Sequence, residues 1–121
     1  MSVLIVEDDP SIATLIASIC RYRGWTCDVV PDGAAAIPHL HRGRYGAIVL
    51  DLMLPRYNAF EVLTFLRAEK RDLLKRVIVI TAASPVMLEA FDVTDVCTLI
   101  RKPFEIDDLQ DAIERVLSVE E

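Results

Sequence analysis

Five short runs of aliphatic and β-branched residues, separated by longer segments with helical periodicity, are the feature that most constrains this fold. The runs cover residues 3–6, 25–30, 47–50, 77–80 and 96–100. Three of these runs are continuously apolar, which is typical of parallel strands that are covered on both faces. Strand followed by helix, repeated five times, therefore predicts a central parallel sheet with helices on both faces and right-handed crossovers.

The length of the chain limits how such repeats can be arranged. A chain of 121 residues suits a single domain and is too short for two independent cores. A closed eight-fold barrel would need about twice this length. We therefore expect an α/β doubly wound sheet with strand order 2-1-3-4-5, without a linker, an internal repeat or a low-complexity tract.

Capping residues and apolar stripes mark the helices between the runs. Asp9 can cap the first helix, Pro10 suits its first position, and Gly24 ends it where a left-handed residue is needed. Asn58 and Glu61 have the spacing of a capping box at the start of the third helix. The stripes expected to face the core are Ile12, Leu15, Ile16 and Ile19 in the first helix, Phe60, Leu63 and Leu66 in the third, and Ile106, Leu109, Ile113 and Val116 in the last.

Two helices are predicted to be short or irregular. The second begins at Asp32-Gly33, but Pro38 then falls inside it, lacks an N–H donor and clashes with the preceding turn. The fourth extends only from Pro85 to about Phe91.

Composition excludes several classes of function. The net charge of −6 argues against a surface that binds nucleic-acid phosphates directly. The longest apolar runs have the length of strands, far below the roughly 18 residues of a membrane span. The first residues lack a basic segment and soon become acidic, so they do not resemble a signal peptide. We therefore expect a cytoplasmic protein without a membrane segment.

Acidic, hydroxyl and basic residues follow four of the predicted strands directly. The first strand ends in Glu7-Asp8-Asp9, the third in Asp51, the fourth in Thr81 and the fifth in Arg101-Lys102-Pro103. With strand order 2-1-3-4-5 the order reverses between strands 1 and 3, and sites form there beyond the carboxyl ends of the strands. Taken singly, Asp9 can be a helix cap, Thr81 a strand-end residue and Lys102 a solvated lysine. Their arrival together at one edge of the sheet favours a shared site.

The chemistry of these side chains points to a phosphoryl group. Carboxylates packed together repel, and one of them would be protonated unless a cation joins them. Lys102 supplies one positive charge, which is not enough for three carboxylates. Oxygen ligands favour a hard ion, and Mg²⁺ combines one or two carboxylates with waters and a phosphate. Asp51 can then act as the nucleophile that forms an aspartyl phosphate, with Thr81 and Lys102 on the phosphoryl oxygens.

Four motifs resemble those of the receiver domains of two-component response regulators. They are Val6-Glu7-Asp8-Asp9, Asp51-Leu52-Met53-Leu54-Pro55, Thr81-Ala82 and Lys102-Pro103-Phe104, with family-like spacing between Asp51, Thr81 and Lys102. The resemblance spans essentially the whole chain. It implies a flavodoxin-like (βα)5 three-layer sandwich and a single receiver domain over residues 1–121, which is either complete or the N-terminal part of a longer regulator.

The resemblance also implies roles for individual residues. By this similarity Asp8, Asp9 and Asp51 bind Mg²⁺ together with the backbone carbonyl of Met53. Asp51 accepts a phosphoryl group from a sensor histidine kinase or a phosphotransfer protein. Thr81 and Lys102 then move toward the phosphate, and this movement shifts the population between two states. The two states differ in the surface formed by the fourth helix, fifth strand and fifth helix, which a downstream effector reads.

A signalling domain of this kind is a phosphoprotein in a phosphorelay and not an enzyme. At most it phosphorylates itself from small donors and loses the phosphate slowly. The residues two positions beyond Asp51 and Thr81, Met53 and Ala83, have no polar side chain to position water, which predicts a long-lived phosphoryl state. In one dimer type of the family, an acidic residue at the fifth strand pairs with an Arg of the fifth helix. Cys97 and Thr98 occupy the acidic position in this chain, so that charge pairing is absent. Other phosphorylation-dependent dimers stay open.

Three departures from the family pattern concern the step after phosphorylation. Leu99 stands where family members usually carry an aromatic residue that, with the threonine, forms the switch. Residues 56–59, Arg-Tyr-Asn-Ala, replace the usual small residues and Asp-Gly pair after the acceptor motif. Residues 92–95 replace the common Gly-Ala turn before the fifth strand, which predicts a short or irregular fourth helix.

Two alternative functions stay open at this stage. The first is a receiver-like interaction module that has lost phosphorylation, to which Leu99 and the altered loop after Pro55 give some support. The second is a Mg²⁺-dependent phosphohydrolase on a similar sheet. Such enzymes place a second Asp two residues after the nucleophile, and Met53 fills that position here.

Overall fold

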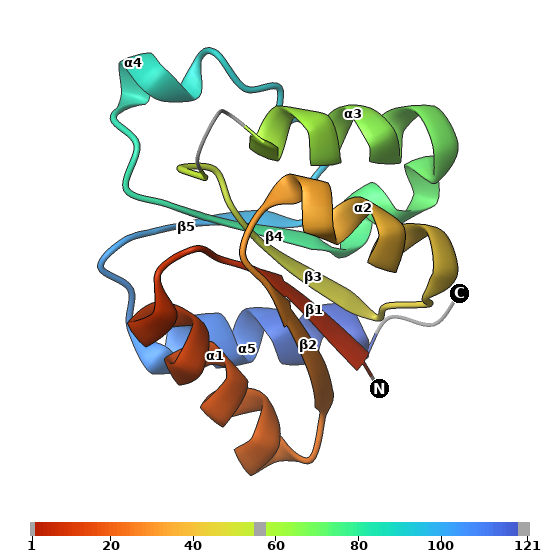
Figure 1. Cartoon of the computed structure of the whole chain (residues 1–121). Coiled ribbons are helices and arrows are strands. Elements are labelled where there is room, and N and C mark those ends of the chain that lie inside the picture. Colours follow the sequence, from red (N-terminus) through yellow and green to blue (C-terminus); the bar gives the residue numbers. More distant parts are fainter. Residues whose placement is uncertain (1, 55–57, 119–121) are drawn as a thin grey trace.

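The computed structural model describes residues 2–54 and 58–118, and in them one parallel sheet forms the centre of the molecule (Figure 1). The strands follow the order β2-β1-β3-β4-β5, as predicted from the repeat. Their bounds are Ser2–Val6 (β1), Thr26–Val30 (β2), Ala47–Asp51 (β3), Val77–Thr81 (β4) and Thr98–Arg101 (β5). All neighbouring strands pair in parallel, so their carboxyl ends meet at one edge of the sheet.

Helices cover both faces of this sheet and give the three layers expected from the sequence. α1 and α5 lie on one face, whereas α2, α3 and α4 lie on the other (Figure 1). The helices are Pro10–Arg23 (α1), Gly33–Arg42 (α2), Asn58–Glu69 (α3), Pro85–Leu88 (α4) and Ile106–Leu117 (α5), with a 3-10 helix at Arg71–Arg76 (η2). The 3-10 helix was not predicted.

The core consists of two apolar clusters, one on each face of the sheet. In β1, Val3 and Ile5 face α1 and α5, whereas Leu4 and Val6 face α2 and α3. The strands β3 and β4 are buried along their whole length. Successive side chains of a β-strand point to opposite faces of the sheet, so continuously apolar strands are needed to build both clusters.

The ends of α1 agree with their predicted signals. The Asp9 carboxylate accepts hydrogen bonds from the backbone N–H groups of Ser11, at 2.8 Å, and Ile12, at 3.3 Å. Pro10 is the first helical residue, and Gly24 ends the helix with a φ of 77°. The capping box predicted from Asn58 rests on a side chain that lies outside the described residues.

Each predicted apolar stripe is wrong at one edge residue. Leu15, Phe60 and Ile106 have exposed fractions of 37%, 38% and 47%. The buried face of α1 includes the smaller Ala13 and Cys20 instead. Small residues let a helix approach the sheet closely. The buried face of the helix can then be centred on them, and a larger residue that the helical spacing alone assigns to the core remains exposed.

The region before β5 differs most from the prediction. α4 has four residues and none of them is buried, so it is even shorter than expected. β5 begins at Thr98 and not at residue 96, because Val96 packs with Val93 against the core cluster beside α3. α2 continues through Pro38 and stays shorter than α1, α3 and α5.

Within residues 2–54 and 58–118, no helix is both long and apolar enough to cross a bilayer.

Candidate functional site

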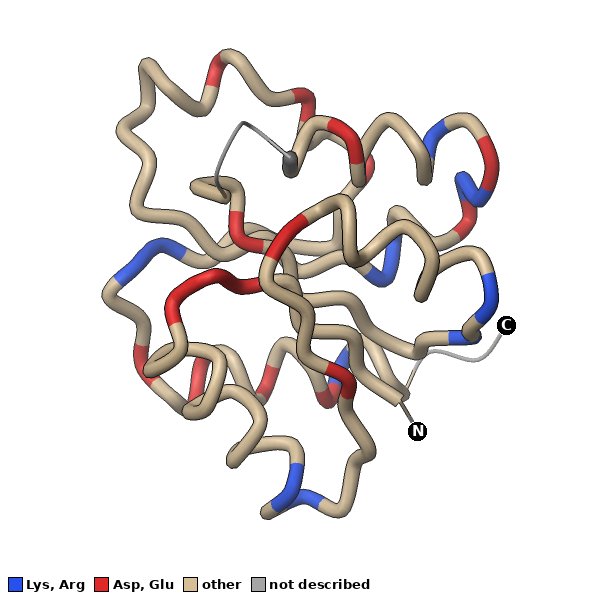
Figure 2. The backbone as a smooth tube through the Cα atoms, in the orientation of Figure 1, with Lys and Arg blue, Asp and Glu red and all other residues tan. Residues whose placement is uncertain are grey.

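An acidic cluster occupies the edge of the sheet where the strand order reverses. Glu7 and Asp8 follow β1, and Asp51 ends β3, the neighbouring strand. One carboxylate oxygen of each lies within 4.8 Å of the others. Figure 2 shows the acidic stretch after β1 beside the acidic end of β3. Glu7 and Asp51 are buried, whereas Asp8 is exposed to solvent.

Lys102 bridges the two buried carboxylates of this cluster. Its Nζ lies 2.8 Å from Oε1 of Glu7 and 3.0 Å from Oδ2 of Asp51. Lys102 directly follows β5, and its backbone N–H donates to the carbonyl of Thr81 at 2.8 Å. The end of β4 therefore holds the start of this segment, so the lysine reaches across from the edge strand to the centre of the site.

The charges of the cluster are not balanced by the lysine alone. Burial raises the pKa of Glu7; the hydrogen bond from Lys102 opposes this change and the nearby Asp51 adds to it, and the resulting pKa is about 7. Burial by itself would lower the pKa of Lys102, but its hydrogen bonds to Glu7 and Asp51 outweigh burial and raise it. Glu7 thus takes up a proton more readily than usual because it is buried beside a second carboxylate, that of Asp51. An all-oxygen donor set of this kind fits a divalent hard cation such as Mg²⁺.

The structure differs from the sequence prediction at Asp9. The Asp9 carboxylate caps α1, and Glu7 joins Asp8 and Asp51 in the cluster instead. The backbone N–H of Asp9 also donates to Oε2 of Glu7 at 3.1 Å. The sequence signal that could have distinguished the capping role of Asp9 from the cluster role of Glu7 is the Asp9-Pro10 pair. An Asp before a helix-initiating Pro is expected to use its carboxylate as the cap.

Thr81 lies at the end of β4, buried beside the acidic cluster. Its Oγ1 accepts a hydrogen bond from the backbone N–H of Ala83 at 2.9 Å, and both residues are almost completely buried. The carbonyl of Ala83 in turn accepts from Nη2 of Arg101 at 2.7 Å. The turn after β4 is therefore tied both to the threonine hydroxyl and to the end of β5.

Two further predicted positions lie around the site. The backbone N–H of Met53 donates to Oδ1 of Asp51 at 2.9 Å, while the Met53 side chain is 41% exposed. A ligand role for the Met53 carbonyl stays a prediction. Leu99 lies half-buried in β5 and packs against the cluster on the α2 and α3 face. Residues 55–57 of the unusual loop lie outside the described residues.

Comparison with known proteins gives one consistent family. Residues 3–114 match the family described as response regulator receiver domain. The probable transcriptional regulatory protein TcrX of Mycobacterium tuberculosis is 34% identical over 110 residues, which are 90% of this chain and 46% of that protein. The transcriptional regulatory protein DltR of Streptococcus agalactiae is 32% identical over 90% of this chain and 48% of its own length. The chain thus spans less than half the length of these curated relatives.

Solved structures agree with this likeness. The receiver domain of the sensor histidine kinase PA1611 from Pseudomonas aeruginosa, with magnesium coordinated in its active-site cleft, has a TM-score of 0.85 and 27% identity over 98% of each chain. The response regulator protein TrrA from Thermotoga maritima, in complex with Mg²⁺ and BeF, has a TM-score of 0.81 and 25% identity over 96% of this chain and 98% of that one. With its five-stranded sheet, its strand order and its family match, this chain belongs to the receiver domains of two-component response regulators.

Proposed function

We propose that this receiver domain takes up a phosphoryl group on Asp51. The observation that carries the proposal is the buried Asp51 carboxylate, which contacts the Lys102 ammonium and clusters with the carboxylates of Glu7 and Asp8. Of the residues around it, Glu7, Asp8 and Asp51 would hold Mg²⁺, with the Met53 backbone carbonyl as a further ligand. Bound there, Mg²⁺ would offset the negative charge of the phosphoryl oxygens.

The transfer uses groups that this chain supplies. An Asp51 carboxylate oxygen attacks the phosphorus of a phosphohistidine, and the phosphorus–nitrogen bond of the donor breaks. The electron pair of that bond stays on the imidazole nitrogen, which then takes a proton. The ammonium of Lys102 and the hydroxyl of Thr81 are the donors that hydrogen-bond the new phosphoryl oxygens.

The partners follow from this reaction. The donor is a sensor histidine kinase or a phosphotransfer protein, and the phosphorylated state is read on the face formed by α4, β5 and α5. Relatives named as transcriptional regulatory proteins are about twice as long as this chain, so a downstream effector domain or protein is the proposed reader. Residues 1–121 do not bind nucleic acid directly in this proposal, which their net charge of −6 supports. The whole reaction takes place in the cytoplasm.

The test is labelling by a small phosphodonor, acetyl phosphate, followed by intact-protein mass spectrometry. We expect one phosphoryl group per chain with Mg²⁺ and none when the metal is chelated. The Asp51→Asn variant should take up none, whereas Asp32→Asn should label like the wild type. Asp32 caps α2, and asparagine keeps that cap, so it is a matched control for the loss of one carboxylate. Labelling of Asp51→Asn at the wild-type level would contradict the proposal.

The same assay separates the alternative functions. A phosphohydrolase would release phosphate in many turnovers, whereas a receiver gives near-stoichiometric labelling. An interaction module without phosphorylation would give no label at all. We expect the label to decay slowly, because neither Met53 nor Ala83 offers a polar side chain to an attacking water.

A further inference from the structure

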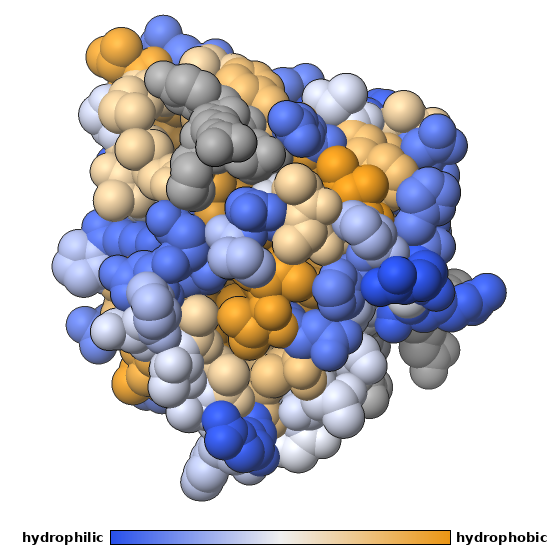
Figure 3. All heavy atoms as spheres, viewed as in Figure 1, coloured by the Kyte–Doolittle hydropathy of each residue, from blue (hydrophilic) through white to orange (hydrophobic). Residues whose placement is uncertain are grey.

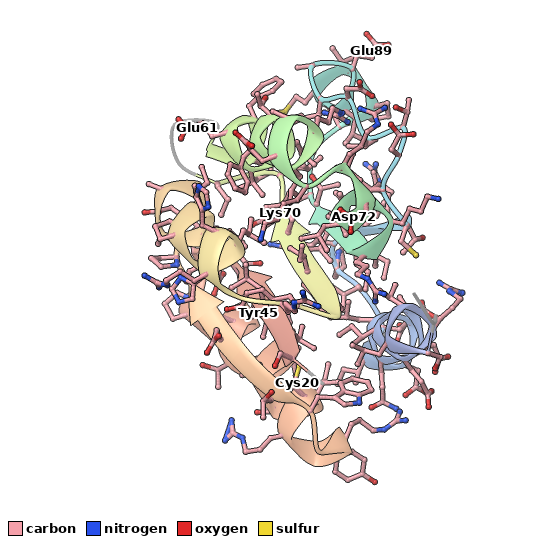
Figure 4. The ribbon with its side chains drawn as sticks, turned by 90° about the vertical axis from the view of Figure 1, so that its right-hand side faces the viewer. Cys20, Tyr45, Glu61, Lys70, Asp72 and Glu89 are labelled. Carbon is pink, nitrogen blue, oxygen red and sulfur yellow. The ribbon has the colours of Figure 1, made fainter. Side chains whose placement is uncertain are left out.

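The segment between α4 and β5 lies on α3 in this chain. After the short α4, residues 89–97 reach the start of α3 and pass behind that helix in Figure 1 before they enter β5. Val93 and Val96 pack there against the core cluster, and Phe91 is buried within it. Glu89, at the end of α4, lies at the periphery of the molecule away from the sheet (Figure 4). We call residues 89–97 the α3-docked segment.

An aromatic stack joins this segment to the start of α3. The rings of Phe60 and Phe91 are nearly parallel, with an angle of 17° and centroids 4.5 Å apart. Phe91 is 6% exposed, whereas Phe60 is 38% exposed. Phe60 belongs to the first turn of α3, which follows the loop after Asp51. The stack therefore connects the α3-docked segment to the element that the phosphoacceptor loop leads into.

Two arginines of α3 and η2 hold the middle of the segment. Nη2 of Arg67 donates to the backbone carbonyl of Asp92 and lies 3.6 Å from its carboxylate. Nη2 of Arg71 lies 3.3 Å from Oδ2 of Asp95. The Asp92 carboxylate also accepts from the N–H and hydroxyl of Thr94, which shapes the turn and lowers the pKa of Asp92. Both aspartates and Arg71 are exposed to solvent, which weakens these ion pairs, so the contact is weak enough to open.

The start of the same stretch is tied to the phosphorylation site. Ala83 is 1% exposed, and its N–H has the Thr81 hydroxyl oxygen as acceptor. If that hydroxyl turns toward a phosphoryl group on Asp51, the buried N–H loses its acceptor, and the backbone must move to find another. The movement reaches α4, where no residue is fully buried and Leu88 packs only partly buried against the core cluster. Figure 3 shows apolar atoms at the surface over α4, where Val86 is 76% exposed.

We infer that the contact of Phe91 with Phe60, secured by Arg67 and Arg71, is the switch that phosphorylation of Asp51 opens. This inference rests on the proposed function and names its regulation. In the unmodified protein the α3-docked segment is held on α3. Phosphorylation shifts the population toward a released state, in which the segment before β5 becomes available to a partner. In this chain Phe91 thus takes the reporting role, while the half-buried Leu99 of β5 is aliphatic and packs against the core cluster.

Hydrogen–deuterium exchange tests the direction of the switch. The probe is beryllofluoride with Mg²⁺, and peptides covering residues 89–97 and the site residues 51–53 and 81–83 are followed by mass spectrometry. In the wild type we expect protection at the site residues and faster exchange in the α3-docked segment. The variant Arg67→Gln/Arg71→Gln should exchange fast in that segment before any addition, and Phe60→Leu should do the same. Lys75→Gln, which removes an exposed positive charge from η2, is the matched control and should behave like the wild type.

Linkage supplies an independent measurement. If phosphorylation favours release, then release must favour the phosphorylated form by the same factor. We expect the Arg67→Gln/Arg71→Gln variant to bind beryllofluoride about two- to five-fold more tightly than wild type, as suits the loss of two exposed ion pairs. Wild-type affinity in this variant would overturn the inference, as would a site that responds while residues 89–97 stay unchanged or become protected. A wild type without a response at Asp51 and Thr81 would overturn the proposed function, and the inference with it.

Discussion

Asp8 and Asp9 are sequence neighbours with separate tasks in this structure. Asp8 belongs to the acidic cluster, whereas the Asp9 carboxylate caps α1. We predict that Asp8→Asn lowers the affinity for Mg²⁺ at least about ten-fold, because a charged ligand is lost. Asp9→Asn should keep both the metal affinity and the stability, since asparagine caps helices as well as aspartate does. Calorimetric titration with Mg²⁺ gives the affinities of both variants.

A complementary substitution separates the cap from the metal. Asp9→Ala removes the cap oxygen and should reduce the free energy of unfolding by about 1 kcal/mol. Its affinity for Mg²⁺, measured in the folded protein, should remain that of the wild type. A large loss of Mg²⁺ affinity in Asp9→Asn would restore Asp9 as the ligand that the sequence predicted.

Most residues of the candidate site were predictable, because each follows a strand whose position was clear. Asp51, Thr81 and Lys102 come together as their strand ends do. Glu7 was not predicted, although it is buried and bonded to Lys102. A run of three acidic residues does not itself say which two carboxylates join Asp51. That choice depends on the helix cap, and the cap leaves Asp9 on the α1 side.

At the scale of elements, a partly buried hydrogen bond from Tyr45 ties the outer strand β2 to the connection before β3. The hydroxyl of Tyr45 donates to Oδ2 of Asp28 at 2.6 Å, and the Tyr45 ring is buried (Figure 4). Burial, followed by the hydrogen bond to Asp28 and its charge, raises the pKa of Tyr45 from 10.0 to about 12. Because the phenol holds its proton more tightly in the folded state, its contribution to stability is complete below about pH 10 and is lost as the pH rises through about 12.

We therefore predict a pH-dependent effect of Tyr45→Phe. At pH 8 the variant should lose about 1 kcal/mol of unfolding free energy, the typical worth of one such hydrogen bond. The difference from the wild type should shrink at pH 11, where the wild type is losing this contribution. Urea unfolding at both values measures it. Tyr22→Phe, which changes an exposed ring, is the control and should show no such difference. An equal loss at both pH values would argue against the raised pKa.

Elements with strong local signals were predicted well, and those that depend on tertiary contacts were not. The cap at Asp9 and the left-handed Gly24 fixed both ends of α1. The start of β5 was predicted two residues too early, because Val96 reads as a strand residue by propensity. In the structure its packing beside α3 decides otherwise. The alternation of strands and helices does not reveal such contacts between distant segments.

At the scale of the whole molecule, the topology was predictable because few arrangements satisfy a five-fold repeat of strand and helix. Right-handed crossovers and two covered faces leave a doubly wound sheet as the solution for this length. The two core clusters on opposite faces agree with it. Burial in the core also decides which cysteine thiols are accessible to chemical reagents. Cys97 is exposed, Cys27 is half-buried, and Cys20 is fully buried between α1 and the sheet.

Cys20 should consequently report the opening of the molecule as a whole. Burial, with the Cys27 thiol beside it, raises the pKa of Cys20 from 9.0 to about 12. At a given pH its thiolate population is then about 10³-fold lower than that of a free thiol, and the thiolate is the reactive form. We predict that Ellman's reagent modifies Cys97 first, Cys27 more slowly and Cys20 only through unfolding.

The dependence on urea decides this prediction. The rate at Cys20 should rise with urea concentration with the slope of global unfolding, because its modification needs the core between α1 and α5 to open. Cys97→Ser should remove the fast phase and leave the slow one unchanged. A Cys20 rate that does not respond to urea would mean that α1 separates locally from the sheet while the remainder stays folded. The Asp9 cap would then open with it, and metal binding at Asp8 would fluctuate on the same timescale.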